Sequence, residues 1–312
     1  MSVRHDHGAL TTRAALASVA VALTLLGLKG WAAWATGSVA VLASLADTAL
    51  DVIASLVTLF GVRVAAMPAD TDHRFGHGKA EAIAALVQIG IIIVSGIGIF
   101  WQAAARLLAG ARTADAEYGI AVSLVAVVLT LGLITYQRSV IRRTGSIAIG
   151  TDRLHYQSDL LLNSSVIAAL ALDQYAGLTG ADPVFGILIA LWLLWNALSA
   201  SRHAVDQLMD KEWPEDKRLH FLAVASSRPE AKGIHDLRTR SSGAHDFAQF
   251  HIWVDPAMTV ARAHDIVEAI EGDLAREFPG CDVLIHLDPE GQVDNPGDAL
   301  RETDETREAI PE

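Results

Sequence analysis

VAVLASLADTALDVIASLVTLFGV, residues 39–62, is an apolar run long enough to cross a lipid bilayer, yet it contains two aspartates. Asp47 and Asp51 are four residues apart and therefore project from the same face of a helix. A carboxylate at membrane depth is costly unless another group compensates its charge. The stretch therefore predicts a membrane-spanning helix with a functional polar face.

A second apolar run repeats this pattern in TDRLHYQSDLLLNSSVIAALAL, residues 151–172. His155 and Asp159 are again four residues apart, and Thr151 and Asn163 extend the same polar stripe. Three carboxylates and one imidazole from two helices form an oxygen and nitrogen ligand set that suits a four-coordinate divalent cation. The predicted membrane metal site consists of Asp47, Asp51, His155 and Asp159.

The composition extends this interpretation to most of the chain. Hydrophobic residues make up 52% of the 312 residues, and they form apolar stretches of membrane-spanning length in the first two thirds. Lys29 near the far end of the first stretch is typical of a side chain that snorkels to the interface. The six predicted spans are roughly residues 14–36, 39–65, 81–106, 118–139, 147–172 and 181–204.

Charge separates the remaining third from the membrane part. Residues 205–312 carry 24 Asp and Glu against 11 Lys and Arg, a balance that disfavours nucleic acid as a partner. The predicted domains are residues 1–10, a polar tail; 11–205, a transmembrane domain; 206–290, a soluble domain; and 291–312, an acidic and disordered tail.

Basic residues flank the predicted spans unequally, which predicts the orientation of the chain in the membrane. Only Arg106 and Arg112 are prominent on the side opposite the N-terminus. Positive residues favour the cytoplasmic side, so both termini are predicted to be cytoplasmic. The N-terminal side receives Arg4, Arg13, Arg63, Arg74, Lys79, Arg138, Arg142, Arg143 and Arg202.

The connection between the second and third spans, PADTDHRFGHGKAEA at residues 68–82, is a candidate second cation site. Asp70, His73 and His77 fall within eight residues, and Gly76 and Gly78 permit a tight backbone course. A solvated polar loop explains the same residues without any metal. The spacing alone leaves both interpretations open.

Residues 215–290 predict a small α+β domain with the order α-β-β-α-β. The expected helices are 215–227 and 259–278, and the expected strands are 235–242, 245–255 and 281–288. This order predicts a ferredoxin-like layer of helices on one sheet face. Each histidine alone is typical of a surface or satisfied core residue, but five such ligands on adjacent edges of one small module, four on the strands and one on the second helix, favour metal. These residues are His235, His251, His264, His286 and Asp288.

Four motifs in the same order resemble the cation diffusion facilitator family, and in particular its bacterial ferrous-iron and zinc efflux pumps. They are ADTALD in the second span, HYQSD in the fifth, the loop PADTDHRFGHGKAEA, and GIHDLRTR with IHLDP in the soluble domain. The resemblance covers about residues 10–290. It implies a homodimeric cation/proton antiporter of the bacterial inner membrane, with six transmembrane helices and a C-terminal ferredoxin-like cytoplasmic domain.

The resemblance also implies roles for individual positions. Asp47, Asp51, His155 and Asp159 match the transport site of the family, and the Asp70, His73 and His77 group matches its loop site. Lys79 and Asp210 match a salt bridge at the hinge between the membrane and soluble parts. The cytoplasmic binuclear metal site is matched by His235, His251, His264, His286 and Asp288.

The function predicted from these features is export of a divalent transition metal in exchange for protons. Zn²⁺ suits the mixed ligands best, and Fe²⁺, Cd²⁺, Co²⁺ and Mn²⁺ are further candidates. Metal and protons compete for the same ligand atoms, and the unperturbed pKa of an imidazole such as His155 lies near neutrality. Zn²⁺ is also expected as a regulatory or structural ion in the soluble domain.

Two alternatives remain at this point: a membrane-anchored metal sensor without transport, and a proton-conducting membrane protein without metal. The second explains buried carboxylates but leaves the histidine clusters unexplained. An ATP-driven enzyme is disfavoured, because the sequence lacks a nucleophile–base constellation and GHGKAE lacks the spacing of a phosphate-binding loop.

Overall fold

The computed structural model describes residues 2–36, 39–109, 117–176 and 180–290. The chain divides into two compact units, His5–Asp206 and a second unit that contains the residues from Gln207 onward. The acidic tail predicted at 291–312 lies outside the described residues.

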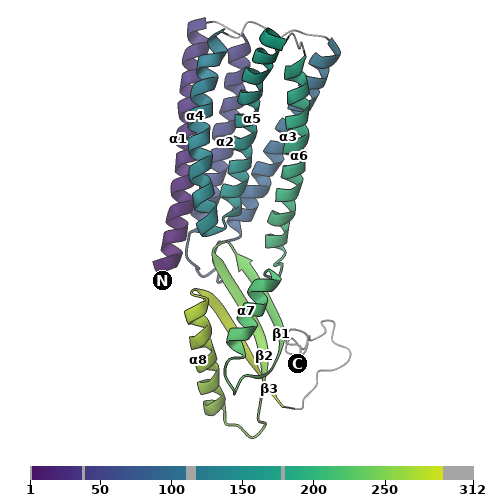
Figure 1. Cartoon of the computed structure of the whole chain (residues 1–312). Coiled ribbons are helices and arrows are strands. Elements are labelled where there is room, and N and C mark those ends of the chain that lie inside the picture. The colour runs from purple at the N-terminus through teal and green to yellow at the C-terminus, as the bar shows by residue number, and fades with distance from the viewer. Residues whose placement is uncertain (1, 37–38, 110–116, 177–179, 291–312) are drawn as a thin grey trace. The chain divides into compact units, whose positions relative to one another are not determined.

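The first unit consists of six long helices that run side by side (Figure 1). Five contain a stretch long and apolar enough to cross a membrane among the described residues. The remaining helix, α5, has a similar length but contains Asp152, Arg153 and Asp159 in its first half. The six-helix fold predicted from the sequence is confirmed. The helices are α1 (Ser2–Thr36), α2 (Val39–Ala65), α3 (Ala80–Ala109), α4 (Glu117–Thr144), α5 (Ile147–Ala176) and α6 (Ala181–Leu208).

Helix α1 begins at Ser2, so the described part of the predicted polar tail continues the first helix. Packing against the end of α2 accounts for this extension. A Cβ added at Gly8 would come within 3.0 Å of the Cβ of Ala66, and the two backbones therefore approach closely. Thr11 is buried and its hydroxyl donates to the carbonyl of His7 one turn earlier.

Helix α5 is central to the helical unit, because it packs against α2, α3 and α4. One cluster of buried apolar side chains joins α5 to three other helices through Ala14, Leu59, Val140 and Ile149. A second cluster joins it to α3 and α6 through Ile92, Leu154 and Leu193. The polar face of α5 is consequently held inside the bundle, beside α2.

The second unit has the predicted element order, with a three-stranded sheet covered by two helices. Strand β1 pairs with β2 antiparallel, β2 pairs with β3 parallel, and α8 forms the crossover between β2 and β3. Phe221, Phe250, Ile270, Leu274 and Ile285 belong to one hydrophobic core, which the unit forms from its own residues. The elements are α7 (Glu215–Ala225), β1 (Lys232–Ser242), β2 (His245–Val254), α8 (Val260–Glu277) and β3 (Cys281–Pro289).

Candidate metal centres

The first candidate centre lies between α2 and α5, where Asp51, His155 and Asp159 come together. His155 Nε2 lies 2.9 Å from Asp51 Oδ1 and 3.8 Å from Asp159 Oδ2. The three potential ligand atoms all lie within 4.8 Å of one another. His155 is only 5% exposed, so this cluster lies inside the helical unit. Periodicity within α5 correctly predicted that His155 and Asp159 share a helix face.

Asp47 is one turn before Asp51 on α2, and it is exposed in the single chain. It is not a member of the three-residue group found among the described residues. The other members of the predicted stripe have local partners. Thr151 donates to the carbonyl of Ile147, and Asn163 donates to that of Asp159, so both bond to their own helix.

Lys29 contacts α2 beside the same cluster. Its Nζ donates to Thr48 Oγ1 at 2.7 Å, and Thr48 in turn donates to the carbonyl of Ser44 at 3.1 Å. Thr48 is 1% exposed and stands three residues before Asp51. Snorkelling was the role predicted for Lys29, but the side chain instead bonds to a buried hydroxyl on the neighbouring helix.

A buried polar network around Asp152 was missed by the sequence reasoning. Asp152 is fully buried, and its Oδ2 accepts from Ser18 Oγ at 2.5 Å and from Gln137 Nε2 at 2.7 Å. Its Oδ1 accepts from Gln88 Nε2 at 3.0 Å, and Gln88 Oε1 accepts from Thr58 at 2.9 Å. The network thus joins α5 to α1, α2, α3 and α4. The position of Asp152 within an apolar helix was the sequence signal that could have revealed this network.

Tyr156 strengthens the attachment of α5 next to His155. Its hydroxyl donates to the carbonyl of Ser18 at 2.9 Å and lies 2.8 Å from Ser55 Oγ on α2. Ser55 is one turn after Asp51. The helix that contains His155 is therefore bonded to α1 on both sides of the histidine, and to α2 one turn from the aspartate.

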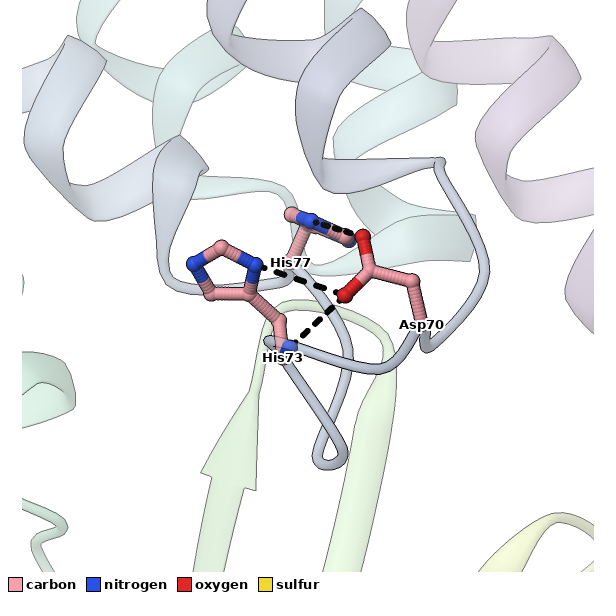
Figure 2. Close-up of side chains that lie close together, drawn as sticks. All are labelled: Asp70, His73 and His77. Atoms are coloured by element: carbon pink, nitrogen blue, oxygen red, sulfur yellow. Dashed lines mark hydrogen bonds and ion pairs between the residues drawn. The ribbon is translucent and has the colours of Figure 1, made fainter.

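The second candidate centre is the loop between α2 and α3, where Asp70 points between His73 and His77 (Figure 2). Asp70 Oδ1 lies 3.5 Å from His73 Nδ1, and Asp70 Oδ2 lies 3.4 Å from His77 Nε2. His77 Nδ1 lies 3.2 Å from the carbonyl of Pro68 and donates to it in one tautomer, which leaves Nε2 available as a ligand. Gly76 has a φ of +79°, which favours glycine and permits the tight turn.

Hydrogen bonds from the backbone hold the carboxylate of Asp70 in place beside the two imidazoles. Its Oδ1 accepts from the backbone N–H of His73 at 2.7 Å and of Asp72 at 2.9 Å. The hydrogen bond from the His73 backbone is the largest influence that lowers the pKa of Asp70. An ionised carboxylate beside two imidazoles is a suitable ligand set for a transition metal.

The third candidate centre lies on the sheet of the second unit. Its strand register places His251 of β2 opposite both His235 of β1 and His286 of β3. Asp288 Oδ2 lies 3.3 Å from His235 Nε2 and 2.8 Å from His251 Nδ1. Its other oxygen, Oδ1, lies 3.3 Å from His286 Nε2. The carboxylate of Asp288 therefore connects all three histidines.

An irregularity in β1 directs its side chains toward this centre. The pairing with β2 shifts on both sides of His235, and Asp236 has a φ of +50°. His235 Nδ1 lies 2.7 Å from the carbonyl of Gly233 and, by donating to it, leaves Nε2 to face Asp288. Asp236 is 8% exposed and its Oδ2 lies 3.8 Å from His251 Nε2. Sequence reasoning missed Asp236, because a strand period alone does not reveal a bulge.

His264 does not join the strand cluster among the described residues of the single chain. It lies on α8 with a side chain that is 66% exposed, and its Nε2 is 3.4 Å from Glu268 Oε1. Asp210 lies in the second unit, 3.6 Å from Arg240 Nη1, whereas Lys79 belongs to the first unit. The pairing of Lys79 with Asp210 therefore stays a prediction.

The membrane-spanning helices and the small α+β unit after the last of them define a multi-pass membrane protein. Residues 15–209 match the family described as "Cation efflux transmembrane domain", and residues 213–290 match "Cation efflux protein, cytoplasmic domain". The chain belongs to the cation efflux family, as the sequence motifs predicted.

Similar proteins extend over nearly the whole chain. The cation-efflux pump FieF of Cronobacter sakazakii is 42% identical, over 92% of this chain and 95% of that protein. The cation-efflux pump FieF of Serratia proteamaculans is 44% identical, over 91% and 94% respectively. The solved metal-bound C-terminal domain of the CzcD transporter from Thermotoga maritima is 27% identical, with 26% of this chain and 99% of that chain covered and a TM-score of 0.25.

Proposed function

We propose that this protein exports a divalent transition-metal cation from the cytoplasm, with Zn²⁺ as the first candidate, in exchange for protons. The observation that carries the proposal is the cluster of Asp51, His155 and Asp159 inside the helical unit. Such a group among apolar helices is costly unless a cation occupies it. Family membership supports cation export as the activity.

The distances within the cluster support a small ion with tetrahedral coordination. Ligands bonded to Zn²⁺ at about 2.0–2.2 Å lie about 3.3–3.6 Å from one another in a tetrahedron. The separations of His155 Nε2 from Asp51 and Asp159, at 2.9 and 3.8 Å, bracket that range. Asp47, one turn along α2, is the proposed fourth ligand. The ligand set also admits Fe²⁺, Cd²⁺, Co²⁺ and Mn²⁺.

Exchange with protons follows from the chemistry of these ligands. Carboxylates and imidazole must lose their protons before they bind a metal, so metal entry releases protons and proton entry displaces metal. Access from the cytoplasm and then from the outside would convert this competition into vectorial export. The proposed orientation has both termini in the cytoplasm and the helices in the inner membrane.

In the second unit we assign one ion to His235, His251 and Asp288 and a second to His286 on the other oxygen of Asp288. The bridging position of Asp288 supports two ions. His264 lies outside this cluster in one chain, so its predicted role as a ligand requires a partner chain in a homodimer. Zn²⁺ here is proposed to be regulatory or structural, and so is the ion proposed for the loop site.

Uptake of radioactive zinc into everted membrane vesicles tests the proposal against its alternatives. Export from the cytoplasm predicts saturable zinc uptake that depends on the protein. A membrane-anchored sensor predicts no uptake above protein-free membranes. A proton conductor without metal predicts proton flux that is unaffected by zinc. A panel of competing metals in the same assay would rank the substrates.

A further inference from the structure

Lys29 is a cationic side chain within an apolar helix, and it reaches α2 between the two aspartates of the candidate site. Its ammonium donates to Thr48 Oγ1 at 2.7 Å. The hydroxyl proton of Thr48 is directed to the carbonyl of Ser44, so its oxygen is left to accept from Lys29. Thr48 is buried, and this contact holds the ammonium at a fixed place on α2.

The ammonium reaches this part of α2 from a third helix, α1. Thr48 directly follows Asp47 and precedes Asp51 by three residues, so its partner Lys29 is close to both turns of α2. Lys29 lies within electrostatic range of Asp47 and of Asp159 on α5. None of the proposed ligand roles uses this charge, since an ammonium is not a metal ligand.

We propose that Lys29 is a permanent counter-ion of the transport site, which brings the metal-loaded cluster to zero net charge and weakens its hold on the metal. Three carboxylates, a neutral imidazole and one divalent cation leave a single negative charge, which the ammonium neutralises. This inference rests on the proposed function, because it assigns Lys29 to the same site.

A site in the interior of apolar helices is more costly the further its net charge lies from zero, so a neutral loaded site can pass through the membrane-embedded states of a transport cycle. The ammonium also repels a divalent cation, and charges interact strongly in a partly dehydrated site. Lys29 is therefore expected to lower the affinity of the site for the metal and to speed release of the metal.

The experiment measures initial zinc uptake into proteoliposomes over a range of zinc concentrations. Lys29→Met keeps the apolar stem but removes the charge, and we expect KM and the maximal rate each to fall about tenfold, in line with one lost charge interaction. Lys29→Arg keeps the charge and should retain both parameters near the parent values. Thr48→Val keeps the charge but removes its anchor, and should lower KM by a smaller factor.

Equilibrium zinc binding provides a second readout that does not require transport. Calorimetry is performed on detergent-solubilised protein with His77→Ala and Asp288→Ala, which removes the ligand shared by both ions of the second unit, so that binding reports the membrane cluster. Added to that background, Lys29→Met should bind zinc about tenfold more tightly. Should Lys29→Met fail to fold, Thr48→Val still decides, because its affinity must rise.

The proposal is overturned if Lys29→Met binds and transports zinc with parent affinity and rate. It is also overturned if Lys29→Met and Lys29→Arg lose rate equally with KM unchanged, since that result indicates packing and not charge. Absence of zinc uptake by the parent would instead refute the proposed transport function, and the calorimetry would then decide the role of Lys29 alone.

Discussion

Asp51 Oδ1 and His155 Nε2 lie 2.9 Å apart, although the two residues are separated by 104 positions in the sequence. The contact joins α2 to α5 at the centre of the helical unit. Asp51→Ala removes one ligand from the proposed site without adding a buried charge. We expect the variant to remain folded and to lose nearly all zinc flux, measured in proteoliposomes after a size-exclusion check.

Asp182→Ala is the matched control for that substitution. Asp182 is in the first turn of α6, where its Oδ2 lies 3.6 Å from Arg106 Nη1. The Arg106 side chain is 54% exposed and the Asp182 side chain 18%, and an ion pair that water reaches in this way contributes about 1 kcal/mol to stability, so the control should transport like the parent. Parent-like flux in Asp51→Ala would remove the cluster from the transport mechanism.

The network around Asp152 predicts a positioning role one turn before His155. Asp152→Ala would leave Ser18, Gln88 and Gln137 without their shared acceptor and should destabilise the protein by about 3 kcal/mol. Asp152→Asn should recover most of that loss. Its amide can donate to Gln88 if the Gln88 amide turns over, because the Thr58 hydroxyl is able to accept instead of donate.

Thermal unfolding in detergent and zinc KM in proteoliposomes measure the two consequences of these Asp152 variants. Misplacement of His155 should raise KM in Asp152→Ala, and Asp152→Asn should restore it. Equal transport defects in both variants would mean that the charge of Asp152 matters and that positioning through hydrogen bonds is the wrong account.

The second unit contains an ion pair whose contribution to stability should depend on pH. Asp273 accepts hydrogen bonds from Arg228 and Arg276, and the bond from Arg228 is the main reason that the pKa of Asp273 lies below its ordinary value of 3.8. A lowered pKa means that the pair stabilises the fold above the ordinary pKa. That contribution is lost as the pH falls through the lowered value.

Asp273→Asn in the domain of residues 206–290 should therefore shift the urea midpoint downward at neutral pH, and the difference from the parent should vanish in strong acid. Asp265→Asn, at an exposed position of the same helix, controls for the loss of one negative charge. A difference that persists unchanged into strong acid would contradict the assignment.

The domain of residues 206–290 has its own hydrophobic core, so we expect it to fold alone, to dimerise and to bind zinc. His251→Ala should reduce zinc affinity by at least about tenfold, because His251 is central in the row of three histidines. His220→Ala is the control, since His220 pairs with Glu277 on α8. Calorimetry that shows equal zinc binding by both variants would refute this metal centre.

Local periodicity predicted much of the fold and of the centres, and contacts between distant elements account for what it missed. Pairs such as Asp51 with Ser55 share a face because the helix repeat fixes their directions. The partners of Asp152 come from several other helices, and no spacing within α5 identifies them. His264 was grouped with the strand histidines by position in the sequence, but α8 keeps it outside their cluster in one chain.

Simultaneous recording of zinc and pH inside proteoliposomes tests the central claim most directly. Reporters for both ions are enclosed in vesicles whose protein has its cytoplasmic side outward. Zinc entry should be accompanied by proton exit, and an acidic interior should accelerate zinc entry in the parent, whereas Asp51→Ala should show neither flux. Zinc entry at a rate that does not depend on the pH gradient, with no proton exit, would contradict the exchange of zinc for protons.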